Sequence, residues 1–531
     1  MFRWKIESNA TSYIFELSNS ADFSSLLISK NITDTSYVIK ENINWQSTYH
    51  WRVKPSDGEY LTSFSFTTNE ASYEFTDDVS PVEIIENNLD SSSNGIVIYG
   101  IMSPFYSAAI DMQGKEIWNS GGVDSYMFSY VENNSFLGDA NLPPHFKGEL
   151  GVEFSTENGI IWNQPTYGDN ADFLQHDLIK LPNGNYLGFV ITDSLHHVPN
   201  SDDYGLPFDF SFEDNIPGFS DDFVYPWTWK GERIVEWNIN GEEVWSWNPF
   251  DHFSLNDFDY ISYFWENVAS SGDPFDWTHF NALAYDEIEN AIYVSSKNLS
   301  RITKIDKTTG NVIWNLGIPW LSGENILEPE DYFSGQHGLE LLDNGNLVFF
   351  DNGILSGRFD GTNIYKSSAI ELKINNINGE FNTETIWSYA LPVELYGVIS
   401  GNVQKLNNGN YLITTVGSSD GAHTLEITPS YEIAWDCKFN VGTPQGAIYR
   451  AMKINGLYNT NMENGCTESL GDINVDGEWN VMDVVTLTNC ILTANCNEIE
   501  NGCAGDMNGN GLWNIIDIVA LVNCVINENC S

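Results

Sequence analysis

One signature, a turn followed by a strand that carries tryptophan, recurs along this chain and restricts its fold more than any other feature. Hairpins with Asn-Gly type turns, such as QHDLIKLPNGNYLGFV and QHGLELLDNGNLVFFDNG, alternate with the signature. Regular four-stranded units with one signature each are typical of a β-propeller. The sequence therefore predicts a mainly β protein with a six-bladed β-propeller over residues 95–458. The signature segments are MQGKEIWNSG, ENGIIWNQP, INGEEVWSWN, TTGNVIWNLG, NTETIWSYA and PSYEIAWDCKF, with Trp118, Trp162, Trp245, Trp314, Trp387 and Trp435.

Further modules are expected on both sides of the propeller. Residues 1–70 alternate apolar and polar residues in short runs (YIFELS, TSYVIK, STYHWRV, TSFSFTT), which predicts a β-sandwich and resembles a fibronectin type III module. Such modules start one strand earlier, so we expect the natural chain to begin upstream, together with any signal peptide. Linkers are expected at 71–94 and 459–465, and a small helical module at 466–531.

Charge and cysteine content restrict the setting of the protein. The chain has 74 acidic and 22 basic residues and a net charge of −52, which argues against a nucleic-acid partner because such partners require a basic face. No run of about 18 apolar residues is present, so no membrane-spanning helix is expected. The dense cysteines between Cys466 and Cys530 predict three disulfides and a secreted or extracellular setting, including the cell surface. Cys437 is expected to be a free, buried thiol.

Two acidic segments, GDINVDGEWNVMDVV and GDMNGNGLWNIIDIV, have the spacing of calcium loops. Calcium takes about six to eight oxygen ligands, which a twelve-residue loop supplies from positions 1, 3, 5, 7, 9 and 12. Aspartate instead of glutamate at position 12, in two tandem loops, resembles the dockerin type I module. The resemblance implies two bound Ca²⁺ ions and a cohesin-like or cell-surface partner. The expected ligands are Asp472, Asn474, Asp476, Glu478 (through its carbonyl), Asn480 and Asp483, and then Asp506, Asn508, Asn510, Leu512 (through its carbonyl), Asn514 and Asp517.

Three histidines occupy equivalent places in the propeller repeat. They are His176 in LQHDLIKL, His279 in THFNALAY and His337 in GQHGLELL. Equivalent positions of a propeller converge on its axis, so we expect these rings near one channel mouth, with Asn281 close to His279. The alternative for each histidine is a core ring that bonds to the backbone.

The propeller segment resembles the arylsulfotransferases, bacterial propeller enzymes that move sulfuryl groups between phenols. The motifs occur in family order: WSWNPFDHF, DWTHFNALAYD, IYVSSKNLSRITKIDKTTGNVIWNLG, FSGQHGLELLDNGNLVFFDNG, SSAIEL and IYRAMKI. The resemblance implies a ping-pong reaction through a sulfated histidine, without a nucleotide cofactor. By the same resemblance, His279 and His337 hold the sulfate and phenolic oxygens, and His423 in TTVGSSDGAHTLEI is the carrier. Tyr449 and Arg450 match a Tyr-Arg pair of the family.

Two positions depart from the family pattern. Ser368 stands where the family has arginine, and Lys366 or Arg358 is the expected substitute. Lys297 stands where arginine is common, which keeps the charge but loses the bidentate fork. Both departures matter because a sulfuryl group in transfer carries negative charge that preorganised cations and donors must stabilise.

The sequence leaves more than one function open. The first is a secreted aryl sulfate:phenol sulfuryl transferase, with small aryl sulfates and phenols as substrates and a calcium-binding tail as tether. The second is a catalytically inactive propeller that binds a ligand or protein in an extracellular assembly, which the missing arginine favours. A quinone-cofactor dehydrogenase would need more blades. The insertion at 194–227 is either a lid or a segment packed on the rim.

Overall fold

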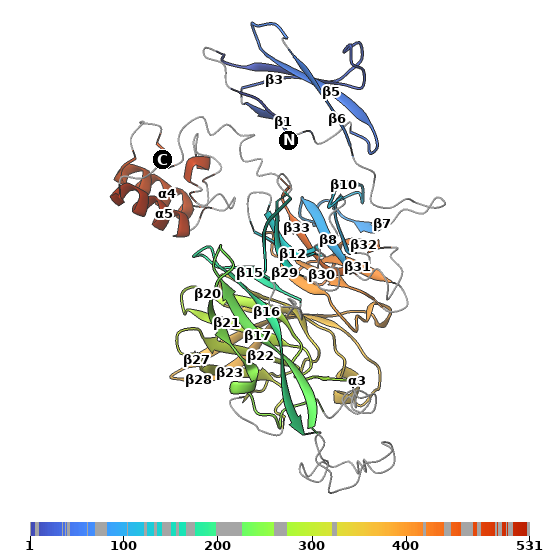
Figure 1. Cartoon of the computed structure of the whole chain (residues 1–531), viewed down its shortest axis with the longest axis vertical. Helices are drawn as coiled ribbons and strands as arrows, with labels where there is room; N and C mark the ends of the chain where they lie inside the picture. Colours follow the sequence, from blue (N-terminus) through green and yellow to red (C-terminus); the bar gives the residue numbers. More distant parts are fainter. Residues whose placement is uncertain are drawn as a thin grey trace. The chain divides into compact units, whose positions relative to one another are not determined.

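The structure is a computed structural model, and Figure 1 shows the whole chain. It is mainly β, and the two longest of its described helices lie near the C-terminus. No helix among the described residues is long and apolar enough to span a membrane. The structure describes residues 2–5, 10–33, 35–37, 39, 43–60, 62–68, 82–102, 105–121, 125–131, 135–140, 150–155, 159–165, 176–197, 226–259, 273–320, 326–417, 421–439, 448–457, 471–474, 479–493, 496, 502–505, 507, 513 and 515–527.

The N-terminal region contains two antiparallel sheets. A small sheet pairs β1 (Phe2–Arg3) with β4 (Ser36–Tyr37). The larger sheet has the order β3 (Leu26–Ile32), β2 (Tyr13–Ser18), β5 (Thr48–Pro55), β6 (Ser63–Thr67). Phe2 from the small sheet packs on Phe15 and Trp51 of the large one, with ring centroids 5.2 Å apart in each case. Two sheets with an aromatic core between them agree with the predicted sandwich, and the fibronectin type III resemblance stays a prediction.

Six sheets make up the described part of residues 82–454. We number them as blades 1 to 6. Their strands are β33 (Ile448–Ile454), β8 (Ile96–Met102), β9 (Phe105–Asp111) and β10 (Glu116–Asn119) in blade 1; β11 (Ser125–Tyr130), β12 (Ser135–Ala140), β13 (Leu150–Ser155) and β14 (Gly159–Asn163) in blade 2; β15 (Leu178–Lys180), β16 (Tyr186–His197), β17 (Pro226–Trp237) and β18 (Glu243–Trp247) in blade 3; β20 (Phe280–Asp286), β21 (Ala291–Ser296), β22 (Arg301–Asp306) and β23 (Val312–Gly317) in blade 4; β25 (His337–Leu341), β26 (Leu347–Asp351), β27 (Ser368–Ile377) and β28 (Glu380–Ala390) in blade 5; and β29 (Asn402–Lys405), β30 (Tyr411–Thr415), β31 (Ala422–Ile427) and β32 (Ile433–Phe439) in blade 6.

The blades are arranged around a common axis. The first strands of successive blades contact one another, from β15 through β20, β25 and β29 to β33, which also contacts β11. Strand β33 comes from the end of the propeller sequence and pairs with β8 from its beginning, which closes the ring. Every signature tryptophan lies in the fourth strand of its blade. The predicted mainly β, six-bladed fold is therefore confirmed for the described residues.

Three short strands extend individual blades. Strand β7 (Val82–Asn87) pairs with β32 and lies inside the stretch 71–94 that the sequence suggested as a linker. Strands β19 (Phe275–Asp276) and β24 (Ile326–Leu327) pair in parallel with β17 and β23. Strand β7 carries neither the turn-plus-tryptophan signature nor an Asn-Gly turn, so no repeat pattern distinguishes it from a linker in the sequence.

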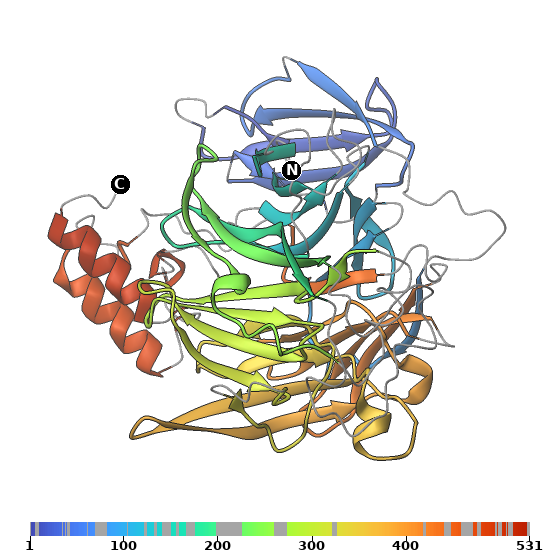
Figure 2. The ribbon, with the colours of Figure 1, turned by 60° about the horizontal axis from the view of Figure 1, so that its bottom comes forward.

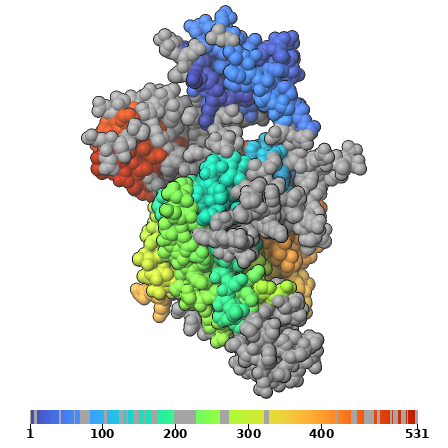
Figure 3. Space-filling model, in the orientation of Figure 1, coloured from blue at the N-terminus to red at the C-terminus, as the bar shows by residue number. Residues whose placement is uncertain are grey.

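The insertion between β16 and β17 is shorter than the sequence suggested. The two strands pair without interruption from Tyr186–Trp237 to His197–Pro226. The hairpin thus includes both ends of the stretch 194–227, and its residues are turquoise to green on the surface in Figure 3. Residues 198–225 lie outside the described residues, so the choice between a lid and a rim insertion stays open.

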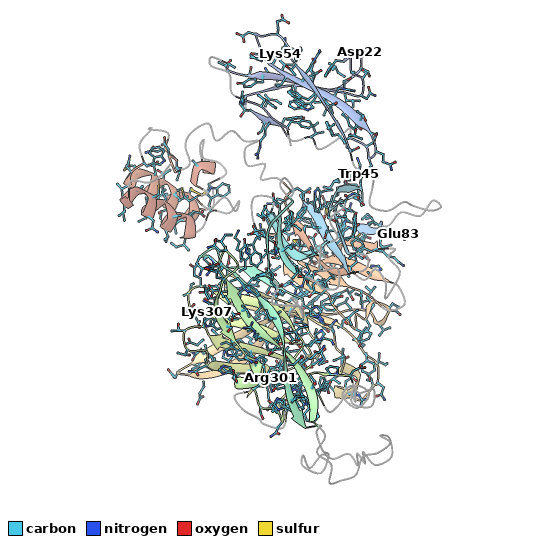
Figure 4. All side chains as sticks on the ribbon, viewed as in Figure 1. Asp22, Trp45, Lys54, Glu83, Arg301 and Lys307 are labelled. Atoms are coloured by element: carbon cyan, nitrogen blue, oxygen red, sulfur yellow. A yellow bond between two sulfur atoms is a disulfide. The ribbon has the colours of Figure 1, made fainter. Side chains whose placement is uncertain are left out.

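Buried ion pairs join neighbouring blades, and we call them the seam pairs. In four of the described blades, a glutamate of the third strand lies opposite the signature tryptophan. Each glutamate binds a lysine of the next blade, for example Lys307, which Figure 4 labels. The seam pairs are Glu153–Lys180, Glu236–Lys307, Glu371–Lys405 and Glu426–Lys453, with N–O distances of 3.0, 2.6, 2.5 and 2.5 Å.

The C-terminal module contains two helices that lie side by side in Figure 2. They are α4 (Val481–Thr493) and α5 (Ile515–Asn527), and a short 3-10 turn, η6 (Gly502–Gly505), contacts both. A disulfide joins Cys490 to Cys496, and Cys524 is also disulfide-bonded. Cys437 in the propeller is free and buried, as expected. The side chains of the remaining cysteines lie outside the described residues, so three disulfides stay a prediction.

Candidate active site

The three equivalent histidines lie at the inner ends of blades 3, 4 and 5. His279 immediately precedes β20, His337 opens β25, and His176 lies two residues before β15. The rings of His176 and His279 are 4.7 Å apart, and His176 stacks on Tyr449 of β33 at 5.9 Å. The Tyr449 hydroxyl donates a hydrogen bond to the His176 carbonyl at 2.6 Å. The structure thus gathers side chains from blades 1, 3 and 4 at the axis.

His279 is oriented by a carboxylate. Its Nδ1 lies 2.5 Å from Oδ2 of Asp276, three residues earlier in the chain. Burial opposes ionisation of Asp276, but the nearby His279 and Lys297 outweigh it and lower the pKa of Asp276. An ionised carboxylate that accepts the Nδ1 hydrogen leaves the Nε2 atom of His279 for proton transfer, as in catalytic Asp-His pairs.

His337 has a defined tautomer. The amide nitrogen of Asn352 donates to the carbonyls of Gly397 and Ser400 at 2.7 and 3.0 Å, so Asn352 Oδ1 is an acceptor. His337 Nδ1 lies 2.7 Å from that oxygen and must carry the hydrogen. Burial, followed by the charge of Lys297, lowers the pKa of His337 to about 3. His337 is therefore a neutral imidazole at physiological pH, with its lone pair on Nε2.

His176 is an uncompensated polar group in this cluster. Its Nδ1 is buried and has no hydrogen-bond partner among the described residues. Burial and then the charges of His279 and His337 lower the pKa of His176 well below its usual range. Its backbone lies in the left-handed region, at φ 72°, which is costly for a residue other than glycine.

Lys297 supplies positive charge beside the histidines. Its backbone nitrogen donates to the His279 carbonyl at 3.1 Å, and its Nζ lies 3.2 Å from Oδ1 of Asn298. Burial lowers the pKa of Lys297, while Asp276, Asp259 and Glu232 act in the opposite direction. Because Lys297 also perturbs the pKa values of His176 and His337, its charge acts on the whole cluster.

Arg450 forms an ion pair and a hydrogen bond with buried groups of other blades. It pairs with buried Asp177 at 3.1 Å and donates to the Asn281 carbonyl at 2.8 Å. Asn281 in turn donates its side-chain amide to the Gln336 carbonyl at 2.7 Å. These contacts link blade 1 to blades 3, 4 and 5. Arg450 and Asn281 therefore join neighbouring blades at the axis, and their part in the reaction stays a prediction.

The described calcium-loop residues belong mainly to the first loop. Oδ1 of Asp483 accepts hydrogen bonds from the backbone of Ile473 and Asn474 at 3.0 and 3.2 Å, and Oδ2 accepts one from Asn480 at 2.9 Å. Asp472 is 2% exposed and Asp483 is fully buried, an arrangement that suits a cation with oxygen ligands. Asp517 of the second loop is also fully buried.

The calcium prediction stays untested by these residues alone. Among the described residues, no group of three or more acidic, histidine or cysteine side chains is arranged to hold a metal ion. Most of the predicted ligands lie outside the described residues, namely Asp476, Glu478, Asp506, Asn508, Asn510, Leu512 and Asn514.

Comparison with known families agrees with both resemblances. Residues 228–450 match the arylsulfotransferase (ASST) family model. Residues 470–525 match the dockerin type I domain. No curated protein matches this chain. The arylsulfotransferase match includes blades 4 to 6 and the cluster residues Asp276, His279, Lys297 and His337.

Solved structures add only distant likenesses. A periplasmic gluconolactonase from Pseudomonas aeruginosa is 8% identical, with a TM-score of 0.32 and coverage of 83% of this chain and 99% of that one. A chain of a nidogen–laminin complex is 8% identical, with a TM-score of 0.34 and coverage of 67% and 97%. TM-scores this low carry no inference about this chain.

His423, the carrier that the arylsulfotransferase resemblance implies, occupies a different kind of position. It lies in β31, the third strand of blade 6, and it is 3% exposed. Its Nδ1 lies 2.7 Å from Oδ1 of Asp436 on β32. His423 thus forms a second Asp-His pair, two strands outward from the first strand of its blade. Its role as carrier stays a prediction.

The predicted substitutes for the missing arginine lie at the surface. Ser368 opens β27 and is half-buried, whereas Lys366 and Arg358 are exposed. Lys366 acts on Asp360, whose pKa is lowered chiefly by hydrogen bonds from Thr362. The described contacts therefore do not join Lys366 to the histidines, and Lys297 is the lysine that lies among them.

Sequence reasoning missed three residues of the site. Asp276 orients His279, Asn352 fixes the tautomer of His337, and Glu232 binds the two residues that flank His279. Asp276 had a local signal, because DWTH places an acid three residues before the histidine. Asn352 and Glu232 come from other strands, and no local pattern marks them.

Proposed function

We propose that the propeller transfers a sulfuryl group from an aryl sulfate to a phenol through a sulfohistidine, without a nucleotide cofactor. The match of residues 228–450 to the arylsulfotransferase family supports this class of reaction. The observation that carries the proposal is the Asp276–His279 pair beside Lys297. It combines a proton-transfer group, an orienting carboxylate and a cation in one partly exposed place, as transfer of an anionic group requires.

In the first half-reaction, a neutral imidazole attacks sulfur and the bond from sulfur to the phenolic oxygen breaks. His279 gives its proton to the departing phenolate, and Lys297 stabilises charge on the sulfuryl oxygens. We assign the attacking nitrogen to His423, following the arylsulfotransferase resemblance. In the second half-reaction the acceptor phenol loses its proton to His279, its oxygen attacks sulfur, and the nitrogen–sulfur bond breaks. Nε2 of His337 can accept a hydrogen bond from a phenol during either step.

A chromogenic aryl sulfate tests this proposal. We expect release of the coloured phenol to depend on an added acceptor phenol, because a ping-pong enzyme stalls as the sulfated form without one. Mass spectrometry of the stalled enzyme should show an increase of about 80 Da, the mass of one SO₃ unit in a covalent intermediate. Absence of both turnover and mass increase would contradict catalysis.

A ligand-binding propeller without catalysis is the second candidate. The observation that favours it is Arg450, whose charge is matched by Asp177, together with Ser368 in the place of the family arginine. This alternative predicts that aryl sulfates or phenols bind with measurable heat in calorimetry but are never converted. Turnover in the chromogenic assay excludes it.

We further propose that the C-terminal module binds two Ca²⁺ ions and docks on a cohesin-like partner outside the cell. The dockerin type I match supports this assignment. Apolar residues are exposed at equivalent places on both helices and could take part in docking. They are Val481, Val485 and Leu492 on α4, and Ile515, Val519 and Ile526 on α5.

Titration of the full chain with Ca²⁺ in a calorimeter tests the tail. We expect two sites, with Asp483→Ala weakening one and Asp517→Ala the other. No calcium uptake by the wild-type chain would contradict the assignment.

A further inference from the structure

Glu232 of β17 binds both residues that flank His279. Its Oε2 accepts a hydrogen bond from the Thr278 hydroxyl at 2.6 Å and from the Phe280 backbone nitrogen at 2.8 Å. Glu232 is 1% exposed and Thr278 is fully buried. A single carboxylate oxygen from blade 3 therefore binds the side chain of the residue before the histidine of blade 4 and the backbone of the residue after it.

The segment that Glu232 fixes is strained and held at several points. His279 lies in the left-handed region at φ 48°, which costs on the order of 1–3 kcal/mol for a residue other than glycine. The carbonyl of Thr278 accepts a hydrogen bond from Ser296 at 2.6 Å, and the carbonyl of Asp276 accepts one from Asn298 at 2.6 Å. Such a conformation persists only where its surroundings hold it. The Lys297 backbone nitrogen binds the His279 carbonyl itself, and Glu232 binds the residue on each side.

Glu232 differs from the seam glutamates, although Glu236 lies four residues later on the same strand. Glu236 binds Lys307, whereas Glu232 makes no ion pair among the described residues. Burial and the nearby charge of Asp276 raise the pKa of Glu232 to about 8. Burial and Asp276 thus favour the neutral form of Glu232, and Asp276 is the carboxylate that faces His279.

We propose that Glu232 is the positioning residue that holds His279 in the orientation required for proton transfer. It acts through Thr278 and Phe280 and does not contact the substrate. This inference rests on the proposed sulfuryl transfer, because it assigns the device that places the proton-transfer group of that reaction. Misplacement of a catalytic group by about 1 Å can cost 10²-fold in rate, so the effect should be measurable.

Four single variants of the full chain test the proposal. Glu232→Leu removes both hydrogen bonds, Glu232→Gln keeps an acceptor oxygen for both, and Thr278→Val removes one bond with almost no change of shape. The matched control is Glu236→Leu, which removes a buried glutamate from the same strand but leaves the His279 segment intact. For each variant, kcat and KM are measured with a chromogenic aryl sulfate. The hydrogen on Nδ1 of His279 is observed by proton NMR, and His279→Ala assigns its signal.

We expect Glu232→Leu to lower kcat by about 10²-fold, with KM changed by less than about threefold, and to lose the Nδ1 signal. Glu232→Gln should have a kcat within about threefold of the wild type and should keep the Nδ1 signal. Thr278→Val should lower kcat by about tenfold. Glu236→Leu should keep the wild-type kcat and the Nδ1 signal. Retention of kcat and signal in Glu232→Leu, failure of glutamine to rescue, or loss of the signal in Glu236→Leu would overturn the proposal.

Two complications leave the test decisive. If Glu232→Leu does not fold, Thr278→Val and Glu232→Gln decide by the same signal and rates. If the wild type shows no turnover, the proposed function fails, yet the Nδ1 signal across the variants still shows whether Glu232 orients His279.

Discussion

Buried glutamates at the seams between blades have ion-pair partners, whereas the buried Glu232 near the axis of the propeller has none among the described residues. At the seams, each glutamate has a lysine partner from the next blade and further donors; Glu371, for example, also accepts from Tyr411 and Asn346 at 2.6 and 2.5 Å. These donors outweigh burial and lower the pKa of Glu371. At the axis, Glu232 has hydrogen bonds but no ion pair among the described residues, and its pKa is raised to about 8.

The difference separates groups that hold blades together from groups that are available for chemistry. A fully matched ion pair has little tendency to exchange protons, so it serves as a link between blades. The imidazoles at the axis have depressed or unmatched positions, such as His176 Nδ1 and His337 Nε2, which is typical of functional sites. The next four predictions test this division, from the largest expected effect to the smallest.

The largest effect is expected at a seam. Lys453→Met leaves Glu426, which is fully buried, without its ion-pair partner. Breaking a buried pair in this way costs about 3–5 kcal/mol, so the free energy of unfolding of the propeller should fall by that amount. Denaturant titration followed by tryptophan fluorescence measures it. Lys373→Met, at an exposed lysine of β27, is the control and should change stability by less than about 0.5 kcal/mol. A stable Lys453→Met protein would show that the seam pairs do not hold the blades.

An axis substitution should affect rate more than stability. His279→Ala removes the proton-transfer group and should lower kcat by about 10²-fold, equivalent to about 2.7 kcal/mol. The free energy of unfolding should change by less, because His279 carries 18% exposed side-chain surface and is not a core residue. Rate assays and denaturant titration of the same variant provide the comparison. The prediction is contradicted if His279→Ala destabilises the fold but leaves kcat per folded molecule unchanged, because His279 would then be a structural residue.

Stability should depend on pH through Glu232. Its pKa is about 8 in the folded protein and 4.5 in the unfolded chain, so between these values the folded state keeps a proton that the unfolded state has released. Stability is therefore full below pH 4.5 and falls as the pH rises through 8, by up to about 1.4 kcal/mol per pH unit. Glu232→Gln should remove this part of the pH dependence. If the free energy of unfolding of the wild type and of Glu232→Gln depends on pH in the same way, the raised pKa of Glu232 is contradicted.

The smallest effect is expected in blade 4, where the seam arrangement is inverted. Lys304 lies opposite Trp314 and pairs with Glu289, whose side chain is 59% exposed. An ion pair with one exposed partner contributes about 0–1 kcal/mol, so Glu289→Ala should lower the free energy of unfolding by less than about 1 kcal/mol. A loss as large as that of Lys453→Met would mean that burial does not set the strength of these pairs.

The sequence by itself determined the architecture and the register of its repeats. Fourth-strand tryptophans from Trp118 to Trp435 gave the blade number, because each blade repeats the same local alternation of turn and strand. The same register placed His176, His279 and His337 at equivalent strand starts, and the spacing from Asp472 to Asp483 identified a dockerin-type loop. All of these are short-range patterns, in which turn geometry and alternating side chains are encoded within a few residues.

Only the tertiary structure decided which polar groups face each other. In the sequence, Arg450 is marked only by its match to a Tyr-Arg pair of the arylsulfotransferases, and closure of the ring by β33 brings it to Asp177, 273 positions earlier in the chain. Packing of blade 3 on blade 4 places Glu232 beside Thr278, and ring closure pairs Glu426 with Lys453. Residues far apart in the chain carry no local mark of such partners, because the choice depends on how blades pack around the axis. Local periodicity thus fixes where a side chain lies in its blade, while its charge partner, and with it its chemistry, depends on the assembled ring.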